Sequence, residues 1–260
     1  MRHTVFSFAL FLSAQLIAQT EGIPDMITDR PDQTESAVTV PGGFLQIESG
    51  FVYTWDNENE VKNESYDIGG TLLRYGLLDN WEIRVAGVFI DQKTASGEPD
   101  TTISTSGMGP LTVGTKVFIT GQKGWIPQVA ILSHLVIRNS GDEEFSPSRT
   151  YPSARIAAAH QLSETLGLGY NLGYSYNGES PAGEGFYSAS LGISLHERLG
   201  AFVELFGTFS DPAPPGHSAD AGLTWQVVDN FQFDASAGIG ISESAPDGFV
   251  NAGISWRIPR

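Results

Sequence analysis

The hydrophobic and polar positions of this chain alternate with a period of two over unusually long stretches. Between positions 166 and 177, large residues beginning with Leu166 and ending with Tyr176 alternate with small or polar ones. Such alternation gives a strand one apolar and one polar face. Strands of soluble proteins are about five or six residues long, whereas a tilted strand that crosses a bilayer needs roughly 9–11. This stretch therefore predicts a membrane-crossing β-strand.

The same alternation recurs along the chain and is interrupted by two kinds of polar segment. Short turns are centred near 79, 122, 164, 197 and 229. Longer segments rich in Gly, Pro, Ser, Asn and acidic residues fall between them, at 56–64, 92–107, 139–150, 178–184, 211–217 and 243–247. The stretches between these interruptions predict twelve strands, at about 44–55, 65–77, 81–91, 108–120, 125–138, 151–162, 166–177, 185–195, 199–210, 218–228, 231–242 and 248–258.

Short turns that alternate with longer loops are typical of outer-membrane barrels. We therefore predict an all-β fold, a transmembrane antiparallel up-and-down β-barrel of about twelve strands with short periplasmic turns and longer extracellular loops. A soluble β-sandwich is the alternative, but its strands would be shorter and its turns would not fall into two classes. The mean hydropathy of -0.09 does not oppose a membrane barrel, because half of each strand faces the polar lumen.

The pattern of the N-terminal residues predicts that the protein is exported. A basic start at Arg2 is followed by a mostly apolar run from Val5 to Ala18, which is typical of a secretory signal peptide. No other segment approaches the ~20 apolar residues of a spanning helix. We therefore expect a signal peptide at 1–18, a periplasmic N-terminal segment at 19–43 and a barrel at 44–260, located in the outer membrane of a Gram-negative bacterium. The absence of cysteine excludes disulfides and thiolate sites.

Charge narrows the choice of partners. The formal net charge of -16 argues against nucleic acid, whose phosphates would be repelled. Many of the acidic residues lie in the predicted loops. There they favour the solubility of the loops or, alternatively, bind divalent cations that bridge to lipopolysaccharide. The expected partners are outer-membrane lipid and lipopolysaccharide, the barrel-assembly machinery and a small-molecule solute; the oligomeric state is left open.

The inward-facing positions carry the candidate functional residues. A charge on the lipid face would cost about 2–4 kcal/mol near the midplane, so charged strand residues must face the lumen. The candidates are Glu48, Arg74, Glu82, Arg84, Lys116, Arg138, Arg155, Glu204, Asp220 and Asp234. They could form ion pairs that fill a narrow lumen, or line a path that selects solutes. Twelve strands fall between filled eight-stranded barrels and open porins, so a narrow or plugged pore is expected.

An enzymatic site is not indicated by the sequence. Ser133 and His134 are adjacent in a strand and so point to opposite faces, and the five histidines are scattered. Neither a metal cluster nor a cofactor motif is present. We expect no catalytic residues, no metal and no cofactor.

The segment before the first strand is dense in charged and hydrogen-bonding residues. Positions 27–36 read ITDRPDQTES and precede the Pro41-Gly42-Gly43 turn. The simplest interpretation is a periplasmic linker. The alternative is a plug that folds into the barrel mouth, with Arg30 and Asp32 pairing to charges in the lumen.

The sequence also resembles a known family. The stretch from Thr28 to Ser36, the following PGGFLQIESGF from Pro41 to Phe51, and Leu73–Leu77 with Trp81–Arg84 resemble the outer-membrane transporters grouped as the phenol-degradation (MetA-pathway) family. The resemblance implies a β-barrel and transport, and the family supplies no established catalytic residues.

Three functions are therefore considered. The first is a transporter or channel for a small, hydrophobic or aromatic molecule. The alternative is a structural or surface-interaction barrel whose acidic extracellular loops bind a partner. The third is a lipid-modifying outer-membrane enzyme.

Overall fold

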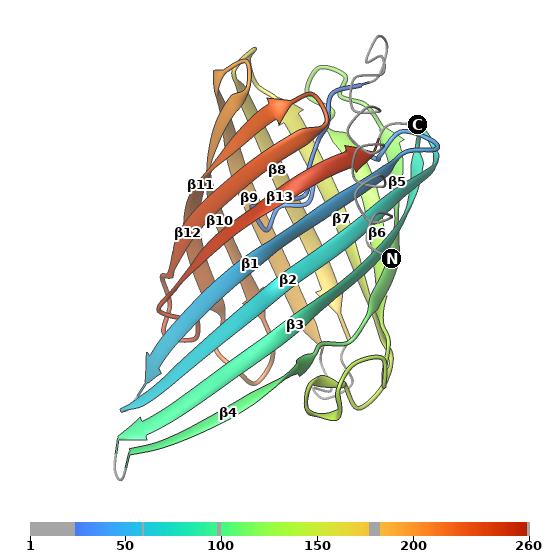
Figure 1. Ribbon diagram of the computed structural model, residues 1–260. Coiled ribbons are helices and arrows are strands. Elements are labelled where there is room, and N and C mark those ends of the chain that lie inside the picture. Colours follow the sequence, from blue (N-terminus) through green and yellow to red (C-terminus); the bar gives the residue numbers. More distant parts are fainter. Residues whose placement is uncertain (1–23, 59, 98–99, 177–182, 259–260) are drawn as a thin grey trace, which may run out of the picture.

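The chain forms a closed β-barrel. The computed structural model describes residues 24–58, 60–97, 100–176 and 183–258. Its strands form one antiparallel sheet, which closes because β2 pairs with β3 as well as with β1 (Figure 1). In this part of the chain no helix has the length and apolar character needed to cross a membrane. The predicted signal peptide at 1–18 lies outside the described residues.

The strands follow one another around the barrel in chain order. They are β1 (Leu45–Glu58), β2 (Val61–Leu78), β3 (Trp81–Gly97), β4 (Asp100–Met108), β5 (Thr112–Thr120), β6 (Gln128–Val136), β7 (Tyr151–Gln161), β8 (Leu166–Ser175), β9 (Glu184–His196), β10 (Leu199–Phe209), β11 (Gly216–Val228), β12 (Phe231–Gly240) and β13 (Gly248–Ile258), with a short 3-10 helix η1 (Glu143–Phe145) between β6 and β7. β13 returns to pair with β1, from Leu45 opposite Ile258 to Trp55 opposite Gly248.

The predicted number of twelve strands is confirmed. β5 pairs with the first part of β3, from Trp81 to Ala86, whereas β4 pairs with its second part, from Phe89 to Gly97. These two segments therefore occupy one strand position, interrupted at Pro110, and twelve positions complete the barrel.

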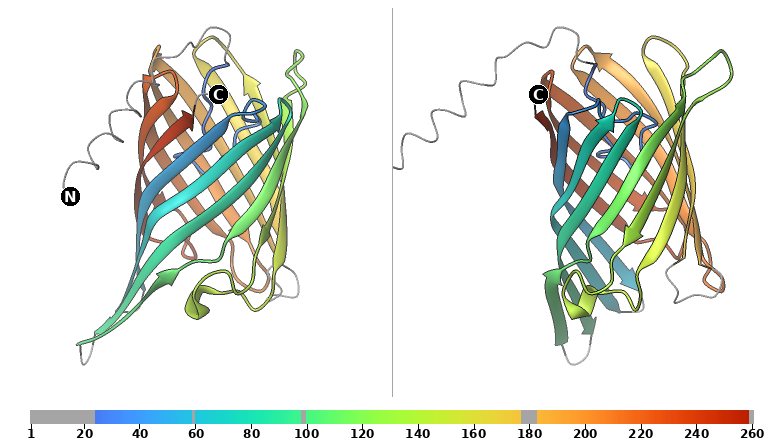
Figure 2. Two further views of the ribbon diagram at one scale, coloured as in Figure 1. Left: turned by 45° about the vertical axis from the view of Figure 1, so that its right-hand side comes forward. Right: turned by 90° about the vertical axis from the view of Figure 1, so that its right-hand side faces the viewer.

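Two predicted loops are strands instead. Most of the described residues assigned to loops at 56–64 and 92–107 belong to β1, β2, β3 and β4, and the ends of these strands reach beyond the others (Figures 1 and 2). The prediction was wrong because a strand exposed to water on both faces has no apolar alternation. Its ladder is held by paired backbones, for example at Glu64 opposite Lys93.

A bulge interrupts β2 near Gly69. The pairing of β2 with β3 shifts register between Ile68 and Thr71, and Gly69 has a φ of 63°. A positive φ is accessible to glycine at little cost, which explains the residue at this position.

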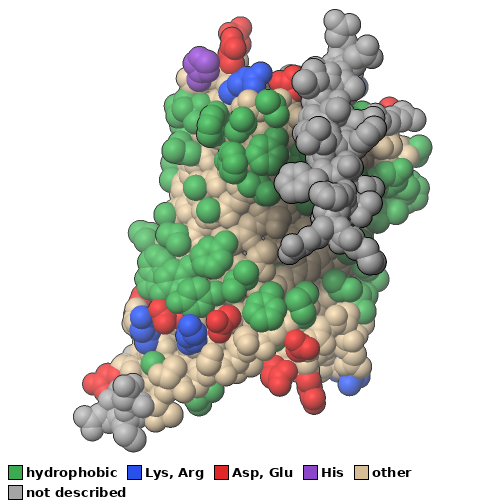
Figure 3. All heavy atoms as spheres, in the orientation of Figure 1, with side chains coloured by type: hydrophobic (Ala, Val, Ile, Leu, Met, Phe, Trp, Pro, Cys, Tyr) green, Lys and Arg blue, Asp and Glu red, His purple; other side chains and the backbone are tan. Residues whose placement is uncertain are grey.

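The barrel is apolar outside and polar inside. Large apolar side chains form bands over the outer wall, with charged side chains beyond them near the ends (Figure 3). Leu172, for example, is 66% exposed on the outer face. In contrast, most of the buried residues are polar or charged, and the buried apolar cluster is small, with Ala37 packed against Ala130, Leu132 and Ala157. This is the reverse of a soluble protein and is typical of a membrane barrel.

Candidate functional site in the barrel lumen

Residues 24–43, here called the N-terminal segment, run inside the barrel near the end where the C-terminus lies (Figure 2). Carboxylates from three different strands accept its backbone N–H groups. Asp29 N–H donates to Glu48 (2.9 Å), Gln33 N–H to Glu204 (2.7 Å) and Val40 N–H to Glu82 (2.7 Å). An irregular segment in a barrel needs such partners, because its backbone groups cannot pair with a ladder. The wall therefore holds the segment from several sides.

A buried charge cluster joins the segment to β1, β2, β3 and β5. Its cations come from the wall, and its carboxylates come from both the wall and the segment. Arg74 contacts Glu48 (2.8 Å) and Glu82 (3.0 Å); Arg84 contacts Glu82 (2.9 Å), Asp29 (2.7 Å) and Glu35 (2.7 Å); and Lys116 contacts Asp29 (2.8 Å). We call these residues the cation cluster: Arg74, Arg84, Lys116, Glu48, Glu82, Asp29 and Glu35.

Strand register explains the composition of this cluster. Arg74 lies opposite Arg84, and Glu82 lies opposite Lys116. Like charges in opposed positions repel, so the two arginines need carboxylates between them. Their side chains are 0% and 2% exposed, and buried charges are tolerated only when paired. Burial opposes ionisation of Asp29, but the surrounding Arg74, Lys116 and Arg84 hold its pKa well below the usual value. Asp29 is therefore a fixed anion.

Arg30 forms a second contact, with β12 and β13. Its guanidinium donates to Asp234 (3.2 Å) and to Asn251 (2.5 Å), and Asn251 in turn donates to the carbonyl of Pro31 (3.0 Å). The guanidinium lies against the wall at Gly50 and Gly253, where a Cβ atom would overlap it. These two glycines make the close approach of Arg30 possible.

The third contact between the N-terminal segment and the barrel wall is formed around acidic side chains. Glu204 on β10 accepts hydrogen bonds from the Gln33 N–H and from the Thr34 hydroxyl, which also contacts Ser188 (2.8 Å). Enclosure in the lumen and the neighbouring Glu204 and Asp220 carboxylates raise the pKa of Asp32 well above its usual value. Asp220 lies opposite Glu204 on β11 and is buried.

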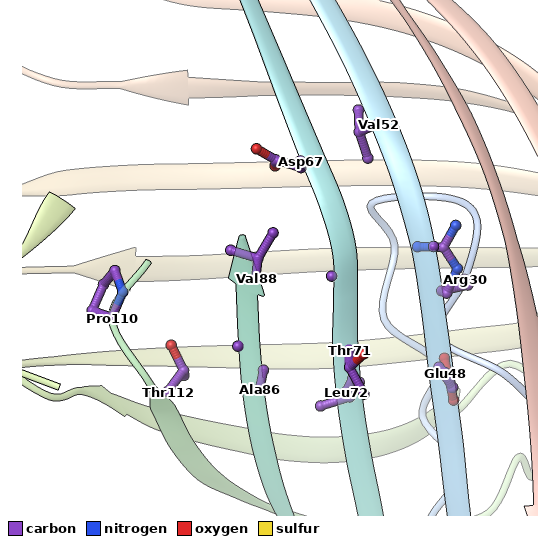
Figure 4. Close-up of a pocket in the computed structure, with 13 residues that line it drawn as sticks. Arg30, Glu48, Val52, Asp67, Thr71, Leu72, Ala86, Val88, Pro110 and Thr112 are labelled. Atoms are coloured by element: carbon purple, nitrogen blue, oxygen red, sulfur yellow. The ribbon is translucent and has the colours of Figure 1, made fainter. Parts of the chain in front are cut away.

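Two cavities adjoin the N-terminal segment, and both touch Arg30. One, of about 280 Å³, lies against β1–β3 beside Glu48, Val52, Asp67 and Val88 (Figure 4). The other, of about 310 Å³, lies against β8–β11, where residues such as Gly167 and Gly200 directly follow the short turns. The second cavity is therefore nearer than the first to the end of the barrel that carries the short turns.

Most of the predicted lumen residues lie where the alternation placed them. The buried ones are Glu48, Arg74, Glu82, Arg84, Lys116, Glu204, Asp220 and Asp234. Arg155 is half-buried; it donates to the Gln33 carbonyl (3.0 Å) and lies over the Phe186 ring. Arg138 was placed wrongly, because β6 ends at Val136 and Arg138 is exposed in the following loop, where Asn139 adopts a positive φ.

The segment's own residues behave differently from one another. Arg30 pairs with a lumen charge, Asp234. The charged neighbours that shift the pKa of Asp32 are both acidic, so no pairing of Asp32 with an opposite charge is found among the described residues. Sequence reasoning missed Asp29 and Glu35, whose only signal was their place in a polar segment. In the described part of the chain, no three His, Asp or Glu side chains are grouped to hold a metal ion.

The barrel is similar to several solved structures. The COG4313 outer membrane channel from Pseudomonas putida F1 matches with a TM-score of 0.68 at 14% identity, over 89% of this chain and 100% of that one. The KdgM porin matches with a TM-score of 0.51 at 6% identity, over 81% and 98%. The translocator domain of the autotransporter NalP from Neisseria meningitidis also matches, with a TM-score of 0.51 at 12% identity, over 96% of both chains. Because proteins with different roles share this barrel, these likenesses show the fold alone.

Sequence comparison is more specific. No curated protein is similar enough to count as a match. The family model described as "Putative MetA-pathway of phenol degradation" matches residues 28–258, which is most of the sequence. The chain therefore belongs to this family of outer-membrane β-barrels.

Proposed function

We propose that this protein is an outer-membrane channel whose N-terminal segment divides the lumen into two chambers. The protein would be exported by its signal peptide, assembled by the barrel-assembly machinery and surrounded by lipid and lipopolysaccharide. The observation that supports the proposal most directly is that both cavities touch Arg30, one toward each end of the barrel. A movement of the segment around Arg30 would join them into one path.

The cavity against β1–β3, here called the outer chamber, has a lining that suggests the class of solute. Val52, Leu72, Ala86 and Val88 give the cavity against β1–β3 an apolar wall, while Asp67 adds a carboxylate (Figure 4). Ligand pockets commonly combine an apolar lining with a few polar groups that fix orientation. We therefore propose that the solute is small, mainly apolar or aromatic, and carries one hydrogen-bond donor.

The first experiment tests whether the segment is the barrier. The chain has no cysteine, so a Thr34→Cys/Ser188→Cys pair, at side chains that touch in the structure, can form a single disulfide to the wall. Single-channel conductance of this variant should be low when oxidised and should rise on reduction. The two single-cysteine variants are the controls and should not respond to reductant. Equal conductance in both redox states would refute the role of the segment as a barrier.

The second experiment tests the solute class. Benzyl alcohol should reduce the current in a concentration-dependent way if it occupies the outer chamber. Ala86→Trp should abolish this effect by filling the cavity that Ala86 lines. Ala235→Trp, on the exposed outer face of β12, is the matched control. Block that persists in Ala86→Trp would place the solute elsewhere.

A further inference from the structure

In the part of the chain that the structure describes, β4 is paired with another strand on one side only, although η1 lies against its Met108 end. It pairs with β3, from Phe89 opposite Met108 to Gly97 opposite Asp100, and it ends the strand order of the sheet. Its in-line continuation β5 pairs with β3 and with β6, but β6 ends at Val136 and does not reach β4. In Figure 1, β4 forms the margin of the strands that reach beyond the barrel.

The hydrogen bonds at the end of β4 show which backbone groups face the free side. Gly109 N–H donates to Val88 on β3 (2.8 Å). The backbone of Met108 points the other way, because its carbonyl accepts from Asp142 N–H (2.8 Å) and its N–H donates to the Asp142 carboxylate (2.7 Å). Alternate residues of a strand direct their N–H and C=O groups to the same side. The backbones of Thr102, Ser104 and Ser106 therefore face the free edge.

This edge lacks the features that usually prevent strand addition. Natural edge strands are protected by charges, prolines or very short length. Residues 101–107 read TTISTSG, with no charge and no proline, and the Ile103 side chain is 64% exposed. Thr and Ile favour extended backbone, so the edge is already in the conformation that a further strand requires.

We propose that the free edge of β4 binds an extended segment of another protein, which adds to the sheet as an antiparallel strand. Its backbone would pair with Thr102, Ser104 and Ser106, as in other cases of strand addition. Exposed Glu143 and Glu144 lie next to Asp142, at the Met108 end of the edge. An antiparallel partner presents its N-terminal end there, so the partner carries basic residues before an uncharged stretch.

A second copy in the same membrane does not fit this edge. Two identical edges pair antiparallel around a two-fold axis perpendicular to the sheet. The sheet stands upright in the barrel wall, so this axis lies in the membrane plane and would invert one of the two barrels (Figure 2). The partner is therefore a different chain on the extracellular side.

The test uses the folded full-length barrel and two fluorescent peptides. One is Lys-Lys-Thr-Val-Thr-Val-Thr, and the other has two glutamates in place of the lysines. Fluorescence anisotropy should show the basic peptide binding about tenfold more tightly than the acidic one at low salt, with the difference falling as salt is added. Equal binding of the two peptides would overturn the charge argument.

Two variants separate backbone pairing from other adhesion. Ser104→Pro removes an N–H on the free side and leaves the side facing β3 unchanged, so it should abolish binding. Ser104→Ala keeps the backbone donor and should bind like the wild type. Both variants should retain the barrel's heat-dependent gel migration. Binding that survives Ser104→Pro, or concentration-dependent pairing of barrels without peptide, would overturn the proposal.

Discussion

Removing the Arg30 side chain should release the N-terminal segment from the wall. In the Arg30→Ala variant, the charge-assisted bonds to Asp234 (3.2 Å) and Asn251 (2.5 Å) are lost. The Asp234 side chain is 0% exposed, so it would remain as an unpaired buried carboxylate. Breaking a buried ion pair costs about 3–5 kcal/mol. Because Arg30 keeps 16% exposure, we expect the lower end, ~3 kcal/mol, which shifts the docking equilibrium by roughly 100-fold.

The labelling rate of a buried cysteine measures this equilibrium. Ala37 is 2% exposed and packs against Ala130, Leu132 and Ala157, so Ala37→Cys reacts with a maleimide only when the segment leaves the wall. If labelling is slower than redocking, its rate follows the undocked population. Adding Arg30→Ala to Ala37→Cys should raise the rate by about two orders of magnitude.

A matched control shows how much the labelling rate changes when a contact is lost that leaves no buried charge. Arg155→Ala removes a contact from Arg155 to the Gln33 carbonyl and leaves no buried charge, so it should cost only about 1 kcal/mol. Adding Asp234→Asn to Arg30→Ala should recover part of the loss, because the unpaired charge disappears. If Arg30→Ala changes the labelling rate by less than about twofold, the Arg30–Asp234 ion pair does not hold the N-terminal segment on the wall as one unit, and the reasoning is refuted.

Three further outcomes are expected. Gly253→Ala should also speed labelling at Ala37→Cys, by about tenfold or more, because its Cβ would displace Arg30. Gly238→Ala, whose Cβ would meet Phe249 and Asp220 rather than Arg30, is the comparison. The raised pKa of Asp32 means that the docked segment is most stable below the ordinary aspartate pKa of about 3.9 and is destabilised as pH rises through the raised value. Conductance should therefore increase with pH. Asp32→Asn should flatten this pH profile of conductance, and an unchanged profile in this variant would exclude Asp32 as its cause. Arg84→Met leaves carboxylates of the cation cluster unpaired and should destabilise the barrel by about 3–5 kcal/mol in urea unfolding, whereas full stability would show that solvent reaches these groups.

The barrel wall was predictable because the membrane imposes a simple rule on it. Lipid on one side and a polar lumen on the other force strict alternation, so positions such as Glu82 and Arg84 could be placed inward from sequence alone. The rule ends where the lipid ends. Beyond it, residues such as Thr94 and Ser104 belong to strands but have no apolar partners in the pattern, and Arg138 follows the alternation although its strand has already stopped.

The interior of the lumen was less predictable, for a different reason. The N-terminal segment has no periodic structure, so no pattern reports which of its side chains meet the wall. Its charge density suggested insertion, but the pairing of Asp29 with three wall cations depends on strands that are distant in sequence. The glycines that admit Arg30 are similarly informative only when Gly50 and Gly253 are seen side by side.

The charge balance of the cation cluster has a consequence for the order of assembly. Arg74, Arg84 and Lys116 belong to the wall, which supplies only Glu48 and Glu82 to oppose them; Asp29 and Glu35 come from the segment. A wall that closed around an empty lumen would therefore trap uncompensated positive charge. β13 closes the barrel against β1. The segment should thus enter before this seam forms, so that residues 24–43 act as an internal template for biogenesis.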